Sequence, residues 1–493
     1  MNWTTQKRAA LLLLASSFLA ACGGGGGGDN NVSQPPPAPQ PPPSQGITGN
    51  GIAVGPITTF GSVVVNGVRY ETNAATVFDI DGSPTGAESD LRVGDTVQIV
   101  AEIDQTTGDA TALEVIYDDA ITGPVDSKND ASQTLTILGQ SILITAETSF
   151  DDDFADPTFE GINIGQIVEV SGSPNSNGVI VASRIEPEAP GTVLELRGVV
   201  SSLDNVAQTF QLGALVVDFS NAVLEEFPSD MISDGDLVDA KGAGTGANGE
   251  LIATEIEFED DFPDLAENDA VELEGFITRF VSSTDFDVAG FPVTTNAQTE
   301  FEEGVAADLA IDALIEVEGL IDANGVLLAE DIEFRIESDI EIFAAVDSID
   351  VANNTVVVLG IPVVIDDLTK IEDNSDFEVD PLTLADINAG DFLEIVGNEN
   401  PMVSGQIEAS LVERDDADDT GIVGFASAVS QPALTVLGVT IETDANTEFT
   451  DSDENEITAA EFFAAVTVGS EIEVTGTESS DTTLIASELS LED

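Results

Sequence analysis

The segment Val436-Leu437-Gly438-Val439 lies between two runs in which apolar and polar residues alternate. Alternation with a period of two predicts β-strands, and a glycine between two such runs predicts a tight hairpin turn. Similar segments recur along the chain at intervals of about 74 residues, a spacing typical of repeated domains. We expect the glycines of these segments to be structural turn residues: Gly67, Gly139, Gly213, Gly290, Gly360 and Gly438.

A threonine follows five of these six glycines at the same offset, and an apolar residue follows each threonine two positions later. The third unit departs from this pattern, with alanine at the threonine position. The five threonines and the alanine are Thr76, Thr148, Ala222, Thr299, Thr369 and Thr447.

The second half of each unit also recurs. A turn that contains glycine opens an alternating strand, as in Ile315-Glu316-Val317-Glu318-Gly319, with the apolar residues expected inside and the acidic ones outside. In the fourth unit we align Ala313 with the turn glycines of the other units. Each unit closes on a strand marked by alanine and, three residues later, an aliphatic residue. The residues 458–465 predict a helix before the fourth strand, and 305–311 are its expected counterpart.

The predicted order is strand, strand, strand, optional helix, strand, strand, which matches the OB-fold, a small partly open β-barrel. The expected fold class is therefore all-β with minor α content: a tandem array of small OB-like barrels. We place the six repeats at residues 50–118, 119–188, 189–261, 262–338, 339–415 and 416–493.

Two motifs, the strand pattern Val-x-Val-x-Gly and the terminal Ala-x-x-Ile, resemble a repeated bacterial domain. It is number 5666 in the series of domains of unknown function. The resemblance covers nearly all of the chain beyond the N-terminal segment. It implies an array of OB-like barrels behind a lipoprotein signal, and it brings no established catalytic residues.

The N-terminus is expected to be a lipoprotein signal peptide over residues 1–21. Lys7 and Arg8 precede an apolar run that is too short to span a bilayer. The tetrad Leu19-Ala20-Ala21-Cys22 then resembles the bacterial lipobox, which implies cleavage before Cys22 and lipidation of that residue. Gly23, where retained proteins carry Asp, points to the outer membrane.

Residues 22–49 form a tether rich in glycine and proline. Glycine runs are flexible and proline runs favour extended polyproline II, so this disordered linker is expected to hold the folded part away from the lipid surface. The barrels would then face either the periplasm or the exterior.

Charge and composition exclude several functions. The chain has 94 acidic against 12 basic residues, a net charge of −82, no histidine and a single cysteine. Nucleic-acid binding needs a basic surface, and Ser-His or Cys-His catalysis and zinc sites need residues that the chain lacks. We therefore expect no enzyme, no small-molecule substrate and no cofactor.

Calcium remains open, because calcium prefers carboxylates that are closely spaced on a turn. The candidate turns are Asp79-Ile80-Asp81-Gly82, Asp151-Asp152-Asp153 and the segment that begins Asp451-Ser452-Asp453. The alternative is that these acids form a solvated coat, so we assign no metal ligands.

The expected function is that of a non-enzymatic, lipid-anchored cell-envelope protein that acts as a structural or protein-interaction module, with the membrane and envelope proteins as the expected partners. The first alternative is a calcium-dependent adhesin or matrix component. A hydrolase that uses two carboxylates is a third reading, and it would need a concave site with two acids facing each other.

Overall fold

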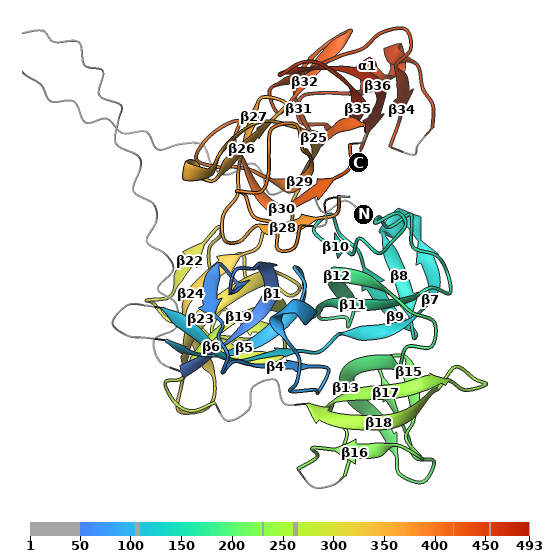
Figure 1. Ribbon diagram of the computed structural model, residues 1–493, viewed down its shortest axis with the longest axis vertical. Helices are drawn as coiled ribbons and strands as arrows, with labels where there is room; N and C mark the ends of the chain where they lie inside the picture. Colours follow the sequence, from blue (N-terminus) through green and yellow to red (C-terminus); the bar gives the residue numbers. More distant parts are fainter. Residues whose placement is uncertain are drawn as a thin grey trace, which may run out of the picture. The chain divides into compact units, whose positions relative to one another are not determined.

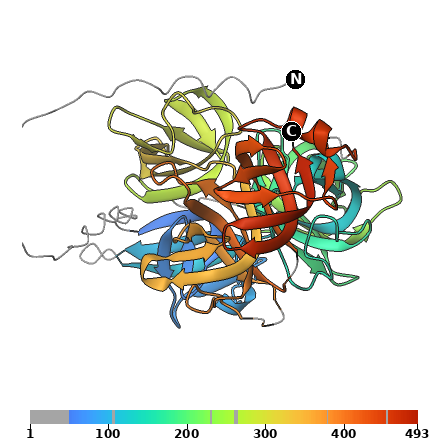
Figure 2. The same cartoon turned by 90° about the horizontal axis from the view of Figure 1, so that it is seen from above.

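The computed structural model describes residues 50–492 except 104–108, 229–230, 260–264, 376, 378, 418 and 453–454. These residues form strands that curl into six small barrels, which confirms the all-β, OB-like prediction (Figures 1 and 2). The expected signal peptide and tether lie outside the described residues.

Each barrel contains six strands. The strands of repeat 1 are β1 (Asn50–Thr59), β2 (Val63–Val65), β3 (Val68–Glu71), β4 (Val77–Ile80), β5 (Thr96–Ile103) and β6 (Ala110–Tyr117). Those of repeat 2 are β7 (Ile121–Asn129), β8 (Thr134–Ile137), β9 (Gln140–Leu143), β10 (Ser149–Phe150), β11 (Ile167–Pro174) and β12 (Ile180–Glu188). Those of repeat 3 are β13 (Leu194–Asp204), β14 (Thr209–Leu212), β15 (Leu215–Asp218), β16 (Val223–Glu225), β17 (Leu237–Thr245) and β18 (Leu251–Glu259).

The second half of the chain repeats this arrangement. The strands of repeat 4 are β19 (Ala270–Ser282), β20 (Asp285–Val288), β21 (Phe291–Thr294), β22 (Glu300–Glu302), β23 (Leu314–Ile321) and β24 (Leu327–Phe334). Those of repeat 5 are β25 (Ile340–Asp350), β26 (Thr355–Val358), β27 (Ile361–Val364), β28 (Lys370–Asp373), β29 (Phe392–Glu399) and β30 (Ile407–Asp415). Those of repeat 6 are β31 (Thr420–Ser430), β32 (Ala433–Val436), β33 (Val439–Glu442), β34 (Glu448–Thr450), β35 (Glu471–Ser480) and β36 (Thr483–Leu491).

Five strands close each barrel. In repeat 1, β1 pairs with both β2 and β5, β2 pairs with β3, and β6 closes the ring by pairing with β3 in parallel and with β5 in antiparallel fashion. The other repeats have the same connections. Among the described strands, closure leaves no long free edge, which protects a β-protein from edge-to-edge aggregation.

The sixth strand is short and was not predicted. β4 runs parallel to β6 with Val77 opposite Glu114, just beyond the point where β3 pairs Tyr70 with Ala110. The two short strands thus follow each other along one edge of β6. Strands of two to four residues, such as β10 and β4, are too short to show an alternating pattern.

The recurring threonine fills the gap between these two short strands. The Thr369 hydroxyl donates to the carbonyl oxygen of Ala409 in β30 (2.8 Å) and accepts from the Asp366 amide (3.0 Å). The other four threonines donate in the same way to the alanine that marks the closing strand of their repeat. The threonine motif therefore supplies the donor, and the alanine motif the acceptor, of one hydrogen bond that recurs in five repeats.

Replacing Thr369 with valine is expected to lower the free energy of unfolding by about 1–3 kcal/mol, because it leaves a buried carbonyl without its donor. Ala222→Thr in repeat 3 is the matched reverse change, and it should be neutral or stabilising by up to about 1 kcal/mol. Urea denaturation followed by circular dichroism measures both. Equal destabilisation by the two changes would contradict this role of the hydroxyl.

The glycine of the Val-x-Val-x-Gly pattern lies at a close approach between strands. A Cβ on Gly319 would lie 2.2 Å from the carbonyl oxygen of Leu328 in β24. Four other repeats have a glycine at the equivalent position with a similar conflict, and Ala101 takes this position in repeat 1. The pairing register shifts at this point in each case, which is typical of a β-bulge.

The hairpin glycines occupy two-residue turns. In most repeats both central residues have positive φ, as in Leu437 (48°) and Gly438 (85°), the pattern of a type I′ turn. In repeat 3 Gly213 (52°) is the first turn residue and Ala214 the second, which is the pattern of type II′. The alignment of the six segments puts Gly213 at the second turn position, like the other five glycines, whereas the structure places it at the first.

Two details of repeat 4 differ from the prediction. Asp312, not Ala313, takes the place of the turn glycine: its φ is 64°, and its amide donates to Ile277 (3.0 Å). Residues 305–311 form no helix, because the Asp308 carboxylate accepts from the Val305 amide (3.0 Å) and closes a turn instead.

The helix expected at 458–465 is present as α1 (Ala459–Ala465). Thr458 and Glu461 form a capping box, in which each side chain accepts from the other residue's amide. Phe462 is buried in the core of repeat 6. Among the described residues, no helix has both the length and the apolar character needed to cross a membrane.

The barrels are joined in pairs through their first strands. β7 pairs with β13, and β25 with β31, so that repeats 2 and 3 and repeats 5 and 6 share continuous sheets and continuous apolar cores. β1 pairs in parallel with β19, which joins repeat 1 to repeat 4 across two intervening repeats. Figure 1 shows this in the blue and yellow strands that lie side by side.

Candidate cation site

The lipidation motif Leu19, Ala20, Ala21 and Cys22 lies outside the described residues. The six turn glycines lie in the hairpins described above, and each has positive φ. They shape the backbone and take no part in a polar cluster.

Two of the three acidic turns are engaged within the protein. The carboxylate of Asp151 accepts from the guanidinium of Arg184 (2.6 Å) and from the Asp153 amide (2.9 Å), so both of its oxygens are used. The Asp451 carboxylate accepts from the backbone and side-chain nitrogens of Asn455. The carboxylates of Asp151, Asp152 and Asp153 still lie within 4.8 Å of one another, but all three come from one turn of repeat 2.

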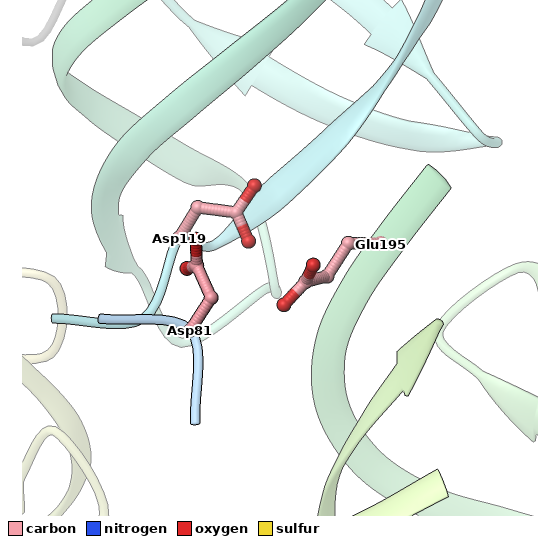
Figure 3. A group of neighbouring side chains, drawn as sticks. All are labelled: Asp81, Asp119 and Glu195. Atoms are coloured by element: carbon pink, nitrogen blue, oxygen red, sulfur yellow. The ribbon is translucent and has the colours of Figure 1, made fainter. Parts of the chain in front are cut away.

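The third turn contributes to a cluster that the sequence did not predict. Asp81 follows β4 in repeat 1, Asp119 lies between β6 and β7, and Glu195 lies on β13 in repeat 3. One carboxylate oxygen from each lies within 4.8 Å of the others. Figure 3 shows the three carboxyl groups converging from separate parts of the chain.

Strand pairing brings these residues together. Thr122 at the start of β7 lies opposite Glu195 in the pairing of β7 with β13, and its hydroxyl donates to Asp119. The Asp81 amide donates to the carbonyl of Tyr117 at the end of β6 (2.9 Å), which holds the turn against the connection between repeats 1 and 2.

One basic side chain borders the cluster. The Lys241 ammonium on β17 lies 3.3 Å from Glu195 and 3.0 Å from Asp239, and it donates to the backbone carbonyl of Asp81 (3.0 Å). Lys241 thus pairs with two carboxylates, and acidic groups outnumber basic ones among these residues at the junction of three repeats.

Burial raises the pKa of each of the three carboxyl groups. Asp119 is 2% exposed, and burial followed by the charge of Glu169 raises its pKa well above the usual range. Burial and the neighbouring Asp119 raise the pKa of Glu195 strongly. Asp81 is exposed as a residue, but protein atoms close to its carboxyl group partly desolvate it, and this raises its pKa to about 6 against the attraction of Lys241. Without a cation, these shifts favour the binding of protons by the cluster.

Such a cluster can bind either protons or a divalent cation. Calcium bonds to oxygen are about 2.3–2.6 Å long, so two opposite ligands on one calcium ion lie about 5 Å apart. Magnesium bonds of about 2.0–2.1 Å allow only about 4 Å. The three oxygens lie within 4.8 Å of one another, which is inside the span that one calcium ion allows.

A depression on repeats 5 and 6 also carries acids but has a different form. Its volume is about 380 Å³, and its lining includes Glu341, Val423 and Glu473. Glu341 and Glu473 both pair with Val423 from the two neighbouring strands, so they project from one face of the sheet in a row. They do not face each other across a cleft, which is what a pair of hydrolytic carboxylates requires.

The sequence reasoning also missed a buried arginine. Arg184 on β12 is 1% exposed, and it contacts Asp151 and Glu186 of repeat 2, Glu372 of repeat 5 and the carbonyl of Val93 in repeat 1. The sequence does contain a signal for this burial. Arg184 is two residues from Ala182 and four from Ile180, so its side chain is expected on the same apolar face of the strand.

Comparisons with known proteins identify the family of this chain, but they assign it no activity. No curated protein matches this chain. Among solved structures, the chain titled "drosophila Unr CSD456" is similar over 44% of this chain and 98% of that chain, with 13% identity and a TM-score of 0.12. At that TM-score the similarity supports no further conclusion.

The family model described as "Domain of unknown function (DUF5666)" matches six segments. They are residues 54–116, 122–186, 197–257, 258–333, 344–413 and 423–490, and each covers most of one barrel. Because these segments together span well over half of the sequence, the chain belongs to the DUF5666 family of domains of unknown function, which it carries in six tandem copies.

Proposed function

We propose that this chain is a non-enzymatic protein of the bacterial cell envelope in which six OB-like barrels act as a structural or protein-interaction scaffold. The observation that carries the proposal is the pairing of β1 with β19, β7 with β13 and β25 with β31. Backbone hydrogen bonds run from one barrel into the next, so each pair holds its surfaces at a fixed spacing. Fixed, repeated surfaces suit several weak contacts with one partner.

Lipid on Cys22 is the proposed anchor, and the outer membrane is the proposed location. The lipobox-like tetrad that ends at Cys22 supports the first point, and Gly23 supports the second. Several acyl chains on one residue are enough for stable attachment without a spanning helix. The proposed partners are envelope proteins, since the charge of −82 repels nucleic acid.

A calcium-dependent adhesin or matrix component is the second candidate. The cluster of Asp81, Asp119 and Glu195 favours it, because a cation there would make the scaffold responsive to external calcium. A carboxylate hydrolase has less support, since the glutamates of the depression on repeats 5 and 6 lie in one row.

Replacing Cys22 with serine is expected to abolish lipid labelling and to move the protein from the membrane fraction to the soluble fraction. The reason is that the thiol is the proposed site of acylation and the anchor depends on it. Labelling cells with a radioactive fatty acid, followed by fractionation, measures both effects. Ser16→Ala, a change within the signal segment but away from the tetrad, is the control. A serine variant that still sediments with membranes would refute the anchor.

The scaffold role is tested with the full chain in envelope extracts. We expect one envelope protein to be retained in a fixed ratio to this chain, and to be lost when Arg184→Met disturbs the junction of repeats 1, 2 and 5. The exposed Arg279→Ala is the matched control. A partner that is retained equally by both variants would show that the arrangement of the barrels is irrelevant to binding.

A further inference from the structure

We propose that one calcium ion binds between the carboxylates of Asp81, Asp119 and Glu195 and thereby links repeats 1, 2 and 3. This proposal goes beyond the scaffold function and does not depend on lipid attachment. It rests on the geometry of the three carboxylates and on one buried oxygen that lacks a partner.

The geometry has three ligand oxygens from three separate segments. They lie within 4.8 Å of one another, and the carboxyl groups converge from the end of β4, the connection before β7, and β13 (Figure 3). A calcium ion among them completes its six to eight oxygen ligands with water, which the exposed position of Asp81 admits.

The buried oxygen belongs to Asp119. One oxygen of its carboxyl group accepts from the Thr122 hydroxyl, while Oδ1 has no hydrogen-bond partner among the described residues. The residue is 2% exposed and its carboxyl group points into the cluster. A buried polar atom without a partner costs free energy, and a bound cation would remove that cost.

Lys241 does not fill this role. Its ammonium lies against Glu195, Asp239 and the backbone carbonyl of Asp81, and among the described residues it forms no ion pair or hydrogen bond with Asp119. A single lysine also cannot contact the carboxyl groups of all of these residues at once. A divalent ion therefore complements the lysine rather than competing with it for the same oxygen.

The position of the site gives the ion a structural effect. Asp81 belongs to repeat 1, while Glu195 belongs to the joined pair of repeats 2 and 3. A common ion holds these parts together only while calcium is present, so the junction is expected to loosen in chelator.

Terbium luminescence can test the site in the full chain, because Tb³⁺ replaces Ca²⁺ and is excited through nearby tyrosine. Beyond the N-terminal segment the chain has no tryptophan and only two tyrosines, and Tyr117 is two residues from Asp119. We expect saturable luminescence that calcium displaces, with an apparent calcium dissociation constant of about 10⁻⁴–10⁻³ M, typical of extracellular calcium modules. Tyr117→Phe should remove the signal while calcium still raises the melting temperature.

Asp119→Asn and Asp81→Asn are each expected to weaken calcium binding at least tenfold. Asp81 is exposed, so its variant remains informative if the buried Asp119 variant folds poorly. Asp126→Asn removes an equal charge from an exposed position on β7 and should leave the affinity unchanged. Equal affinities in all variants would show diffuse binding to the acidic surface and overturn the site. The envelope scaffold and its Cys22 anchor would be unaffected by that result.

Discussion

Replacing Arg184 with methionine is expected to lower the free energy of unfolding by about 3–5 kcal/mol, the usual cost of removing one partner from a buried ion pair. Methionine fills a similar volume but carries no charge. The carboxylates of Asp151, Glu186 and Glu372 would then remain at the junction without their common cation. The carbonyl of Val93 would lose its donor as well.

The large effect follows from where Arg184 lies. Burial lowers its pKa, but the charges of Glu372, Glu186 and Asp95 raise it by more, so the guanidinium stays charged. Its partners come from repeats 1, 2 and 5, and thus from all three barrel pairs. The loss should therefore appear both in the stability of repeat 2 and in the docking of the pairs.

Urea denaturation followed by circular dichroism measures the stability, and limited proteolysis reports the docking. The control is Arg279→Ala, which also removes two ion pairs, to Asp285 and Asp287, but from an arginine that is 44% exposed. Exposed pairs contribute about 0–1 kcal/mol, so the control should be nearly neutral. If the two variants lose equal stability, burial of Arg184 is not the cause.

Raising the pH from 5 to 8.5 in the presence of chelator is expected to lower the free energy of unfolding by about 3–5 kcal/mol. The main groups lie where repeat 4 meets repeat 1. Burial raises the pKa of Glu316 to about 8, and burial with the charges of Asp331 and Glu330 raises that of Glu318 to about 7. Burial and then Glu316 raise the pKa of Glu272 well above its usual value.

The sign follows from proton binding. Each of these groups has a higher pKa in the folded than in the unfolded chain, so the folded state holds more protons between about pH 4.5 and 8. Stability is therefore full below the unfolded pKa near 4.5 and is lost as the pH rises through 7 and 8. Arg335 opposes the effect at Glu316, while Glu333, Glu274 and Glu318 increase it.

Glu316→Gln is expected to remove a large part of this pH dependence, because the amide cannot ionise and can still accept from Arg335. At pH 8.5 the variant should be more stable than the native chain by about 1–3 kcal/mol, because the folded state no longer has to ionise a buried carboxyl group there. Denaturation at several pH values, followed by tyrosine fluorescence, measures the effect, since Tyr70 donates to Glu272 (3.1 Å) at this junction. The exposed Glu448→Gln should leave the profile unchanged. An increase of stability with pH would contradict the sign derived above.

The candidate site was only partly predictable. The turn with Asp81 stood out because closely spaced carboxylates are a local pattern. Asp119 and Glu195 gave no signal, because neither belongs to an acidic run that resembles a calcium loop. The pairing of β4 with β6 places Asp119 near Asp81, and Glu195 joins them through the pairing of β7 with β13, which is a contact between repeats.

The sequence by itself determined the barrel. Hairpin glycines, the threonine that bonds the closing strand, and the alternation of Ile315, Glu316 and Val317 all act within one repeat, where local backbone geometry and burial of apolar side chains suffice. These interactions recur in each unit, so the pattern is visible in one chain.

Only the tertiary structure determined which residues the outward-facing side chains contact. We expect Glu316 to face solvent because it alternates with core residues, yet neighbouring strands enclose it. In the same way, repeat 1 covers Glu272. Likewise, nothing in the order of the repeats predicts that β1 pairs with β19. Alternation tells which face of a strand is apolar, but the partner of the other face is set by contacts between residues far apart in the chain.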